Sequence, residues 1–223
     1  MAGEPLTDAD PAGFGQVYLA TNEAGEDAVA KFIKVVPGAD RELLIADRLT
    51  ADGRPNIVPM LDYGRVGDDW VVVMPRAERS LARHLAENGG SLELEEAVAV
   101  LGDIATALAS LDGDIVHRDL KPPNILRYNG SWCLTDFGIS RYAEATTAPE
   151  TYKFRLTPAY GAPEQWTGER AVAATDMYAF GIIAFEVIEG RLPFEGPELP
   201  DFREQHLHSP VPTISGGLPD SVL

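Results

Sequence analysis

The chain has 223 residues, 45% of them hydrophobic and 24% charged, which suits one globular unit or two small lobes that share a cleft. Its formal net charge of −17 repels phosphate backbones, so we expect no nucleic acid and no anionic membrane among its partners. Cys133 is the single cysteine, which excludes an intrachain disulfide, and its strand-like neighbours favour burial over reactivity.

The N-terminal segment, MAGEPLTDAD, has neither the basic region nor the apolar run of a signal peptide. No apolar stretch reaches the roughly 18 residues that a membrane span needs. We therefore predict a cytoplasmic chain without membrane insertion.

The first part of the chain has the pattern of a small sheet with one helix. Runs of β-prone residues predict strands at 15–21 and 27–36, which the hairpin-like segment NEAGE joins. The apolar and polar residues of 41–50 separate onto two sides at helical spacing. Two more short strands are predicted at 57–64 and 70–75, around the turn RVGDD.

Helical patterns dominate beyond Pro75. Amphipathic helices are predicted at 80–90 and 94–111, and a strongly apolar core helix at 175–190. The remaining expectations are short strands around 114–120, 124–128 and 132–138, an exposed loop at 140–157, and an irregular tail from Pro193. The predicted organisation is a β lobe over 1–74, a hinge over 75–80, and a helical lobe over 81–223.

Four short motifs follow one another along the chain. The segment VHRDLKPPNIL fits H-R-D-L-x-x-x-N, with Asp119 and Asn124 at its key positions. Upstream, VAK ends at Lys31 on a predicted strand; downstream come DFG from Asp136 and APE ending at Glu164. Each tripeptide alone is weak, but four in this order at these spacings make coincidence very improbable.

On these motifs the sequence resembles the eukaryotic-type serine/threonine protein kinases, in the form common in bacteria, from about Gly13 to the tail. The resemblance implies an α+β, two-lobed protein-kinase-like fold: a small antiparallel β lobe with one key helix, and a larger, mainly helical lobe. It implies transfer of the γ-phosphate of ATP to Ser/Thr hydroxyls of protein substrates, including the chain's own activation loop. ATP and Mg²⁺ (or Mn²⁺) are the expected cofactors.

Phosphoryl transfer asks the protein mainly for positioning and charge neutralisation. Asp119 is expected to accept the proton of the substrate hydroxyl, and Lys121 to place a cation on the γ-phosphate. Asn124 and Asp136 supply the oxygen ligands that magnesium prefers. In this family a lysine at position 121 goes with serine/threonine rather than tyrosine kinases.

Lys31 is expected to hold the α- and β-phosphates and to need an anionic partner. Glu42 falls where the family's helix glutamate falls, and Asp40 and Asp47 are the alternatives. A surface ion pair between Lys31 and Glu42 would contribute little to stability, so beside the other motifs we favour the functional interpretation.

The residues near Pro75 match the family's adenine-binding segment. Met74 falls at the gatekeeper position; Pro75 lacks only an N–H, so its carbonyl can still accept from adenine, while Ala77 can donate. The residues expected to sandwich the base with apolar contacts are Val17, Ala30 and Leu126.

The family resemblance also implies regulation through the activation loop. Arg118 is expected to gather a phosphate there by charge-assisted pairing. The acceptors on offer are Thr146, Thr147, Thr151 and Tyr152, of which we favour Thr147 or Thr151. Thr157 matches the threonine that contacts the catalytic aspartate, and Asp176 the aspartate that braces the catalytic loop.

Two departures from the family pattern stand out. The glycine-rich loop keeps its tip, Gly13-Phe14-Gly15, but Asp10 and Ala12 replace its first two glycines, which predicts a stiffer loop and weaker ATP binding. The chain also ends before the further helices of a family member. This predicts missing C-terminal helices, a Glu164 that is unpaired or paired unusually, and self-association through uncovered apolar surface.

Two other functions stay open at this point. The altered loop and the early end fit a pseudokinase-like scaffold that binds nucleotide, or a regulatory module of a larger protein. A kinase of small molecules is disfavoured, because the APE segment and Thr157 belong to a platform for protein substrates. The scattered His84, His206 and His208 form no metal-ligand pattern.

Overall fold

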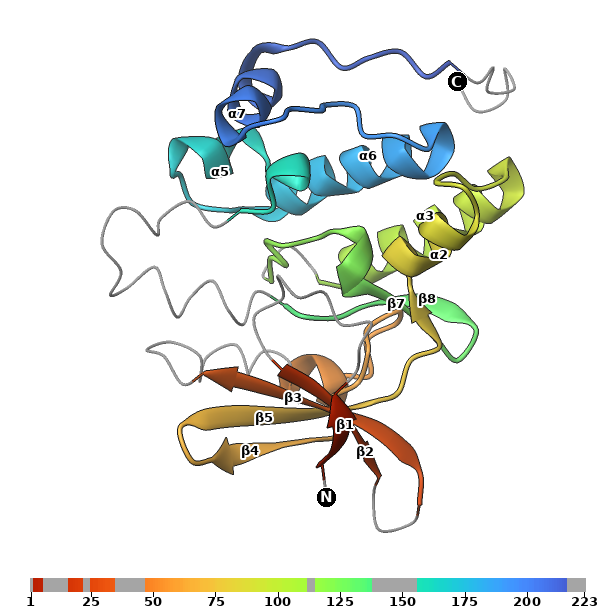
Figure 1. Ribbon diagram of the computed structural model, residues 1–223, viewed down its shortest axis with the longest axis vertical. Coiled ribbons are helices and arrows are strands. Elements are labelled where there is room, and N and C mark those ends of the chain that lie inside the picture. The colour runs from red at the N-terminus through yellow and green to blue at the C-terminus, as the bar shows by residue number, and fades with distance from the viewer. Residues whose placement is uncertain are drawn as a thin grey trace.

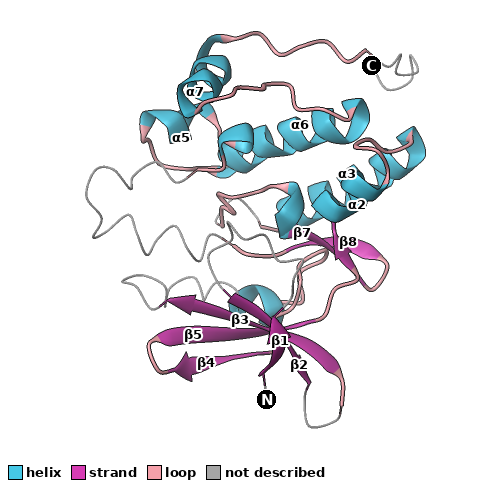
Figure 2. Ribbon diagram, viewed as in Figure 1, coloured by secondary structure: helices cyan, strands magenta, loops and turns pink. Residues whose placement is uncertain are grey.

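A computed structural model describes the backbone of residues 2–5, 16–21, 25–34, 47–111, 115–137 and 156–215. It has a five-stranded antiparallel sheet at one end and a layer of helices at the other (Figure 1). This confirms the α+β, two-lobed prediction, whereas the lobe boundaries at 1–74, 75–80 and 81–223 stay a prediction. Figure 2 shows the division clearly, with a short β-hairpin lying between the sheet and the helices.

The five-stranded sheet has the order β1-β2-β3-β5-β4. Its members are β1 (Ala2–Pro5), β2 (Gln16–Thr21), β3 (Asp27–Lys34), β4 (Asp62–Val66) and β5 (Asp69–Pro75). Ile33 on β3 and Val72 on β5 meet Met60, from the segment before β4, in a small core, with Trp70 and Met74 packed against it. The register sets Lys31 between Val17 on β2 and Val72 on β5.

The helical part contains two 17-residue helices that pack on each other, α3 (Leu94–Ser110) and α6 (Ala173–Glu189). The predicted periodicity is confirmed in α3, where Ala97, Val100, Ile104 and Ala107 are buried on one face. The shorter helices are α2 (Leu81–Glu87), α5 (Pro163–Thr167) and α7 (Leu199–His208). Residues 47–51 are also helical. They include the end of the helix predicted at 41–50 and extend it by one residue.

A second sheet, β6-β7-β8, lies next to the helices. It consists of β6 (Arg79–Ser80), β7 (Ile125–Tyr128) and β8 (Ser131–Leu134), with the short 3-10 turn η1 (Pro122–Asn124) leading into β7. A further 3-10 turn, η3 (Pro158–Tyr160), precedes α5. Because β7 and β8 pair closely, the segments before β7 and after β8 are held near each other.

Three expectations about secondary structure are wrong. The strand predicted at 57–64 begins only at Asp62, since Pro59 cannot donate to a ladder and residue 57 forms just an isolated bridge to Leu134. Residues 115–120 form no strand, because the backbone N–H groups of His117 and Arg118 bond to a side chain instead.

The tail from Pro193 is the third correction, because it contains the ten-residue helix α7. Pro200 lies in its first turn, where a missing N–H costs nothing, and the Asp201 carboxylate accepts from the Glu198 N–H at 3.1 Å. The Pro and Gly content of the flanks hid this helix from the sequence pattern.

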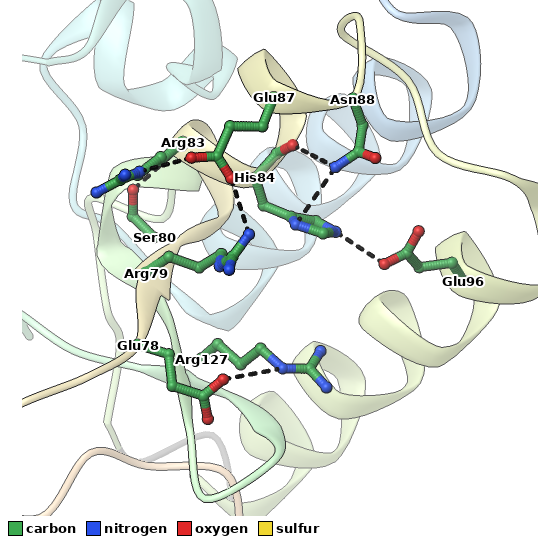
Figure 3. Close-up of polar contacts among 9 residues, drawn as sticks. All are labelled: Glu78, Arg79, Ser80, Arg83, His84, Glu87, Asn88, Glu96 and Arg127. Carbon is green, nitrogen blue, oxygen red and sulfur yellow. Dashed lines mark hydrogen bonds and ion pairs between the residues drawn. The ribbon is translucent and has the colours of Figure 1, made fainter.

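A polar network orients α2 (Figure 3). The guanidinium groups of Arg79 and Arg83 each lie 2.8 Å from an oxygen of Glu87, and the hydrogen bond from Arg83 lowers the pKa of that carboxyl. His84 points the other way, with its Nε2 2.8 Å from an oxygen of Glu96 on α3. Because the side chains of Arg79, Arg83 and Glu87 are well exposed, these contacts orient α2 but add little to the stability of the fold.

Candidate active site

Asp119 lies at the centre of a polar cluster in the loop between α3 and β7. Its carboxylate accepts a hydrogen bond from the Thr157 hydroxyl at 2.9 Å, and the Lys121 ammonium lies 3.4 Å from its second oxygen. Lys121 also donates to the Thr157 hydroxyl at 3.3 Å. The side chains of Asp119 and Lys121 are each 13% exposed, so the cluster remains reachable from solvent. Two residues of the HRD motif segment and one residue from the segment before APE therefore meet at one point.

His117 holds this loop against the segment that carries Asp136. Its buried ring lies near Phe137, with centroids 4.9 Å apart, and its Nε2 is 2.8 Å from the Thr135 carbonyl oxygen. Because a carbonyl only accepts, Nε2 carries the proton, which leaves Nδ1 to accept from the Asp119 N–H at 3.4 Å. The imidazole of His117 therefore connects the two motifs.

Asp176, near the start of α6, binds the backbone of the loop that carries His117 and Arg118. Its two oxygens accept from the backbone N–H groups of His117, at 2.6 Å, and Arg118, at 2.8 Å. Burial raises the pKa of Asp176, while the two N–H groups act in the opposite direction. Arg118 itself has φ +70°, a left-handed conformation that a non-glycine residue adopts only when its surroundings impose it. The contact expected for Asp176 is confirmed.

Asn124 has an amide whose orientation is fixed by its contacts. Its nitrogen donates to the Asp119 carbonyl oxygen at 2.8 Å and approaches the Asp119 carboxylate at 3.4 Å. Only the nitrogen of an amide can donate to a carbonyl, so the amide oxygen points away from Asp119 and is available as a ligand. The Asn124 carbonyl in turn accepts from the Thr135 N–H at 3.1 Å, one residue before Asp136.

Lys31 reaches from β3 to Asp136, with its Nζ 2.6 Å from a carboxylate oxygen. The two side chains are 13% and 29% exposed, so the pair faces a partly solvated space between the sheet and the helical part. Asp136 has φ +61°, a second left-handed backbone at this site. The partner predicted for Lys31, Glu42, lies outside the described residues, as does the alternative Asp40, and the structure brings Lys31 to Asp136.

The residues predicted to contact adenine lie on or directly after strands of the two sheets. Val17 is on β2 and the buried Ala30 is on β3. Leu126 is on β7, in the second sheet next to the helices. Met74 and Pro75 end β5, and Ala77 follows them. The Met74 sulfur accepts from the Thr135 hydroxyl at 3.5 Å, which links the gatekeeper position to the segment before Asp136.

A small pocket opens beside Asp119. It is lined by Arg118, Asp119, Leu120, Thr157, Tyr160, Gly161, Gln165, Thr175, Asp176 and Ala179. The Tyr160 hydroxyl donates to Glu186 on α6 at 2.7 Å, and burial raises the pKa values of both groups. The lining residues place this pocket between the loop 118–120, η3, α5 and α6.

Glu164, the glutamate of the APE motif, accepts a hydrogen bond from the Thr175 hydroxyl. Thr175 is buried and also accepts from the Val172 N–H at 2.9 Å, at the start of α6. The contact with Thr175 ties α5 to α6.

Several predicted site residues lie outside the described part of the chain. They are the loop residues Gly13, Phe14 and Gly15, together with Glu42 and the candidate phosphorylation sites Thr146, Thr147, Thr151 and Tyr152.

The sequence patterns did not predict two interactions near Asp119. Gln165, directly after the APE motif, contacts the catalytic loop, and Tyr160 pairs with Glu186. The positions of Gln165 and Tyr160 within the APE region were the available signal, but their contacts depend on how α5 and η3 pack.

The residues present suit a bound magnesium ion. The Asp136 carboxylate and the Asn124 amide oxygen, which points away from Asp119, are hard oxygen donors. Mg²⁺ takes such donors in proteins alongside substrate phosphates. Within the described ranges, no three His, Cys, Asp or Glu side chains gather as a self-sufficient metal site. A magnesium site completed by phosphate oxygens agrees with that observation.

A model of the protein kinase domain family matches residues 12–214, which is most of the chain. The chain therefore belongs to the protein kinase domain family, as its HRD, DFG and APE motifs predicted.

Its relatives include bacterial serine/threonine-protein kinases. PkaA of Streptomyces coelicolor is 37% identical over 220 residues, which cover 92% of this chain and 40% of the relative. PrkC of Bacillus subtilis is 33% identical over 209 residues, covering 90% and 32%. PknA of Mycobacterium tuberculosis is 31% identical over 225 residues, covering 94% and 52%. The chain thus spans about a third to a half of the length of these relatives.

In the parts of the chain that the structure describes, no helix has both the length and the apolar character needed to cross a membrane.

Proposed function

We propose that the chain is a serine/threonine protein kinase that transfers the γ-phosphate of ATP to hydroxyl groups of proteins. The observation that carries the proposal is the meeting of Asp119, Lys121 and Thr157, within 3.4 Å of one another, in a loop that also holds Asn124. The names of the bacterial relatives support the same activity.

Asp119 is the proposed base that orients a serine or threonine hydroxyl and accepts its proton. Thr157 holds one carboxylate oxygen, so the direction of the carboxylate is set before substrate arrives. Lys121, 3.4 Å from the other oxygen, is close enough to place its cation on the phosphate being transferred. Arg118 is proposed to pair with a phosphate on the activation loop, at Thr147 or Thr151.

ATP is proposed to bind between the sheet and the helical part. Lys31 supplies a cation to its phosphates, and Gly13, Phe14 and Gly15 supply backbone N–H groups. Adenine would bond to the Pro75 carbonyl and the Ala77 N–H. The apolar residues proposed to border the base are Val17, Ala30, Met74 and Leu126. Glu42 remains the proposed helix partner of Lys31.

Magnesium, or manganese in its place, would be held by Asn124 and Asp136. When bound, the ion neutralises negative charge on the phosphates. We also propose protein substrates as partners, a cytoplasmic location and association between copies of the chain, all of which stay predictions.

The proposal is tested by an assay with labelled ATP, MgCl₂ and a generic protein substrate, followed by identification of the phosphorylated amino acid. We expect phosphoserine or phosphothreonine, and a rate about 10²-fold or more lower for Asp119→Asn, because the base is lost. Asp68→Asn, an exposed aspartate in the β4–β5 turn, is the matched control and should keep full activity. Equal rates for the wild type and Asp119→Asn would refute the proposal.

A nucleotide-binding scaffold without turnover is the second candidate, favoured by Asp10 and Ala12 in the glycine-rich loop. A thermal-shift titration with MgATP separates the two. Stabilisation by nucleotide with no phosphate transfer, also after a partner protein is added, would favour the scaffold.

A further inference from the structure

The backbone of Arg118 is held on both sides of its α-carbon. The Arg118 N–H donates to Asp176 at 2.8 Å, and the Arg118 carbonyl oxygen accepts from the Gln165 side chain at 3.0 Å. Between these contacts Arg118 has φ +70°, which is costly for a residue with a side chain. The peptide unit that leads to Asp119 contains the Arg118 carbonyl, so the contact with Gln165 helps set the direction of Asp119.

Gln165 uses both ends of its amide. Its Oε1 accepts from the Ala162 N–H at 3.1 Å, at the start of α5, while its Nε2 donates to the Arg118 carbonyl. An N–H can only donate and a carbonyl can only accept, so these two partners fix which end of the amide faces which way. The side chain is half-buried and lines the pocket beside Asp119.

We propose that Gln165 is a positioning residue for phosphoryl transfer, acting through the Arg118 carbonyl to hold the carboxylate of Asp119 in its working direction. This inference rests on the proposed kinase function. It assigns α5 a direct mechanical connection to the catalytic loop, in addition to the Thr157 hydroxyl, which contacts Asp119 from the same segment.

The competing explanation is that Gln165 merely caps α5 through Ala162. Two substitutions separate these explanations. Gln165→Glu keeps an oxygen for the Ala162 N–H but replaces the donor with a second oxygen facing the Arg118 carbonyl. Gln165→Met keeps the length and the helix propensity and removes both hydrogen bonds. If capping were the whole role, Gln165→Glu would behave like the wild type.

We expect both substitutions to lower kcat about tenfold, which corresponds to about 1.4 kcal/mol of transition-state stabilisation. The effect on Gln165→Glu should be at least as large as on Gln165→Met, because two oxygens then face each other. The KM for ATP should stay within about twofold, since neither Ala162 nor the Arg118 carbonyl belongs to the proposed ATP site. Gln205→Glu and Gln205→Met on α7 are matched controls and should keep wild-type kcat, because Gln205 donates to the Glu195 carbonyl and not to the loop that carries Asp119.

A second measurement does not depend on activity. Hydrogen exchange of the peptide covering 115–120 should be faster in both Gln165 variants than in the wild type and the Gln205 variants, because the Arg118 carbonyl has lost the hydrogen bond from Gln165. Wild-type kcat in Gln165→Glu, or unchanged exchange in both variants, would overturn the inference. Absence of phosphate transfer by the wild type would refute the proposed function instead, and the exchange result would still decide whether Gln165 holds the loop.

Discussion

His206 on α7 is buried among aromatic rings, and its titration should make the protein acid-sensitive. It is 5% exposed, and the rings of Trp166, Tyr178, Phe194 and Phe202 lie with their centroids 4.9 to 6.4 Å from its own. Its Nδ1 is 2.8 Å from the Tyr178 hydroxyl. Burial lowers the pKa of His206 to about 4, from about 6.5 in the unfolded chain.

The sign of the effect follows from proton counting. Between pH 4 and pH 6.5 the unfolded chain binds more protons at this position than the folded chain, so the free energy of unfolding falls as the pH falls. From pH 7 to pH 5 the shift amounts to an upper limit of about 2 kcal/mol, at about 1.36 kcal/mol for each pH unit. The folded protein relaxes around the protonated ring and recovers part of this cost, so we expect about 1 kcal/mol.

The measurement is urea unfolding at several pH values between 5 and 7 for the wild type, His206→Gln and His208→Gln. His206→Gln keeps a polar group for the Tyr178 hydroxyl but does not titrate, so its stability should depend less on pH by about 1 kcal/mol. His208 is two residues further along the same helix with its side chain 64% exposed, and its replacement should leave the wild-type slope intact. Equal losses in the wild type and His206→Gln would refute the reasoning.

Three further predictions concern the active site. Asp176→Ala leaves two backbone N–H groups without their acceptor and should lower the free energy of unfolding by about 2–4 kcal/mol; an unchanged urea midpoint would contradict this. Lys31→Met removes the cation beside Asp136 and should weaken ATP binding about tenfold or more in a thermal-shift titration, whereas equal affinity would exclude phosphate binding by Lys31. The double substitution Asp10→Gly with Ala12→Gly should tighten ATP binding in the same titration, and no change would show that glycine is dispensable at both positions.

Much of the fold followed from periodicity and turn residues. The helices α3 and α6 were predicted within two residues, because long amphipathic or apolar runs at helical spacing have few other solutions. The helix α7 was missed, since its burial depends on aromatic partners from α5 and α6 that local sequence does not reveal. The segment 115–120 has strand-like composition, but a buried carboxylate 58 and 59 positions away takes its backbone donors.

The positions of the site residues came from the order of the short motifs, and the structure supplies their contacts. Asp119, Lys121 and Thr157 meet as the resemblance implied, while the role of each stays a proposal. Gln165 could not be predicted, because its amide matters only once α5 lies over the catalytic loop. A contact between residues this far apart in the sequence leaves no local pattern.

The bracing of Arg118 by Asp176 also has a consequence for the order of events during synthesis. The ribosome completes the motifs that carry Lys31, Asp119 and Asp136 before it makes the braces, since Gln165 lies 47 positions beyond Arg118, and Asp176 lies 58. A growing chain therefore contains the reactive groups while the left-handed turn at Arg118 still lacks what imposes it. If the proposed kinase function holds, we expect a nascent chain to transfer no phosphate to other proteins until α6 has left the ribosome and packed against the loop at Arg118.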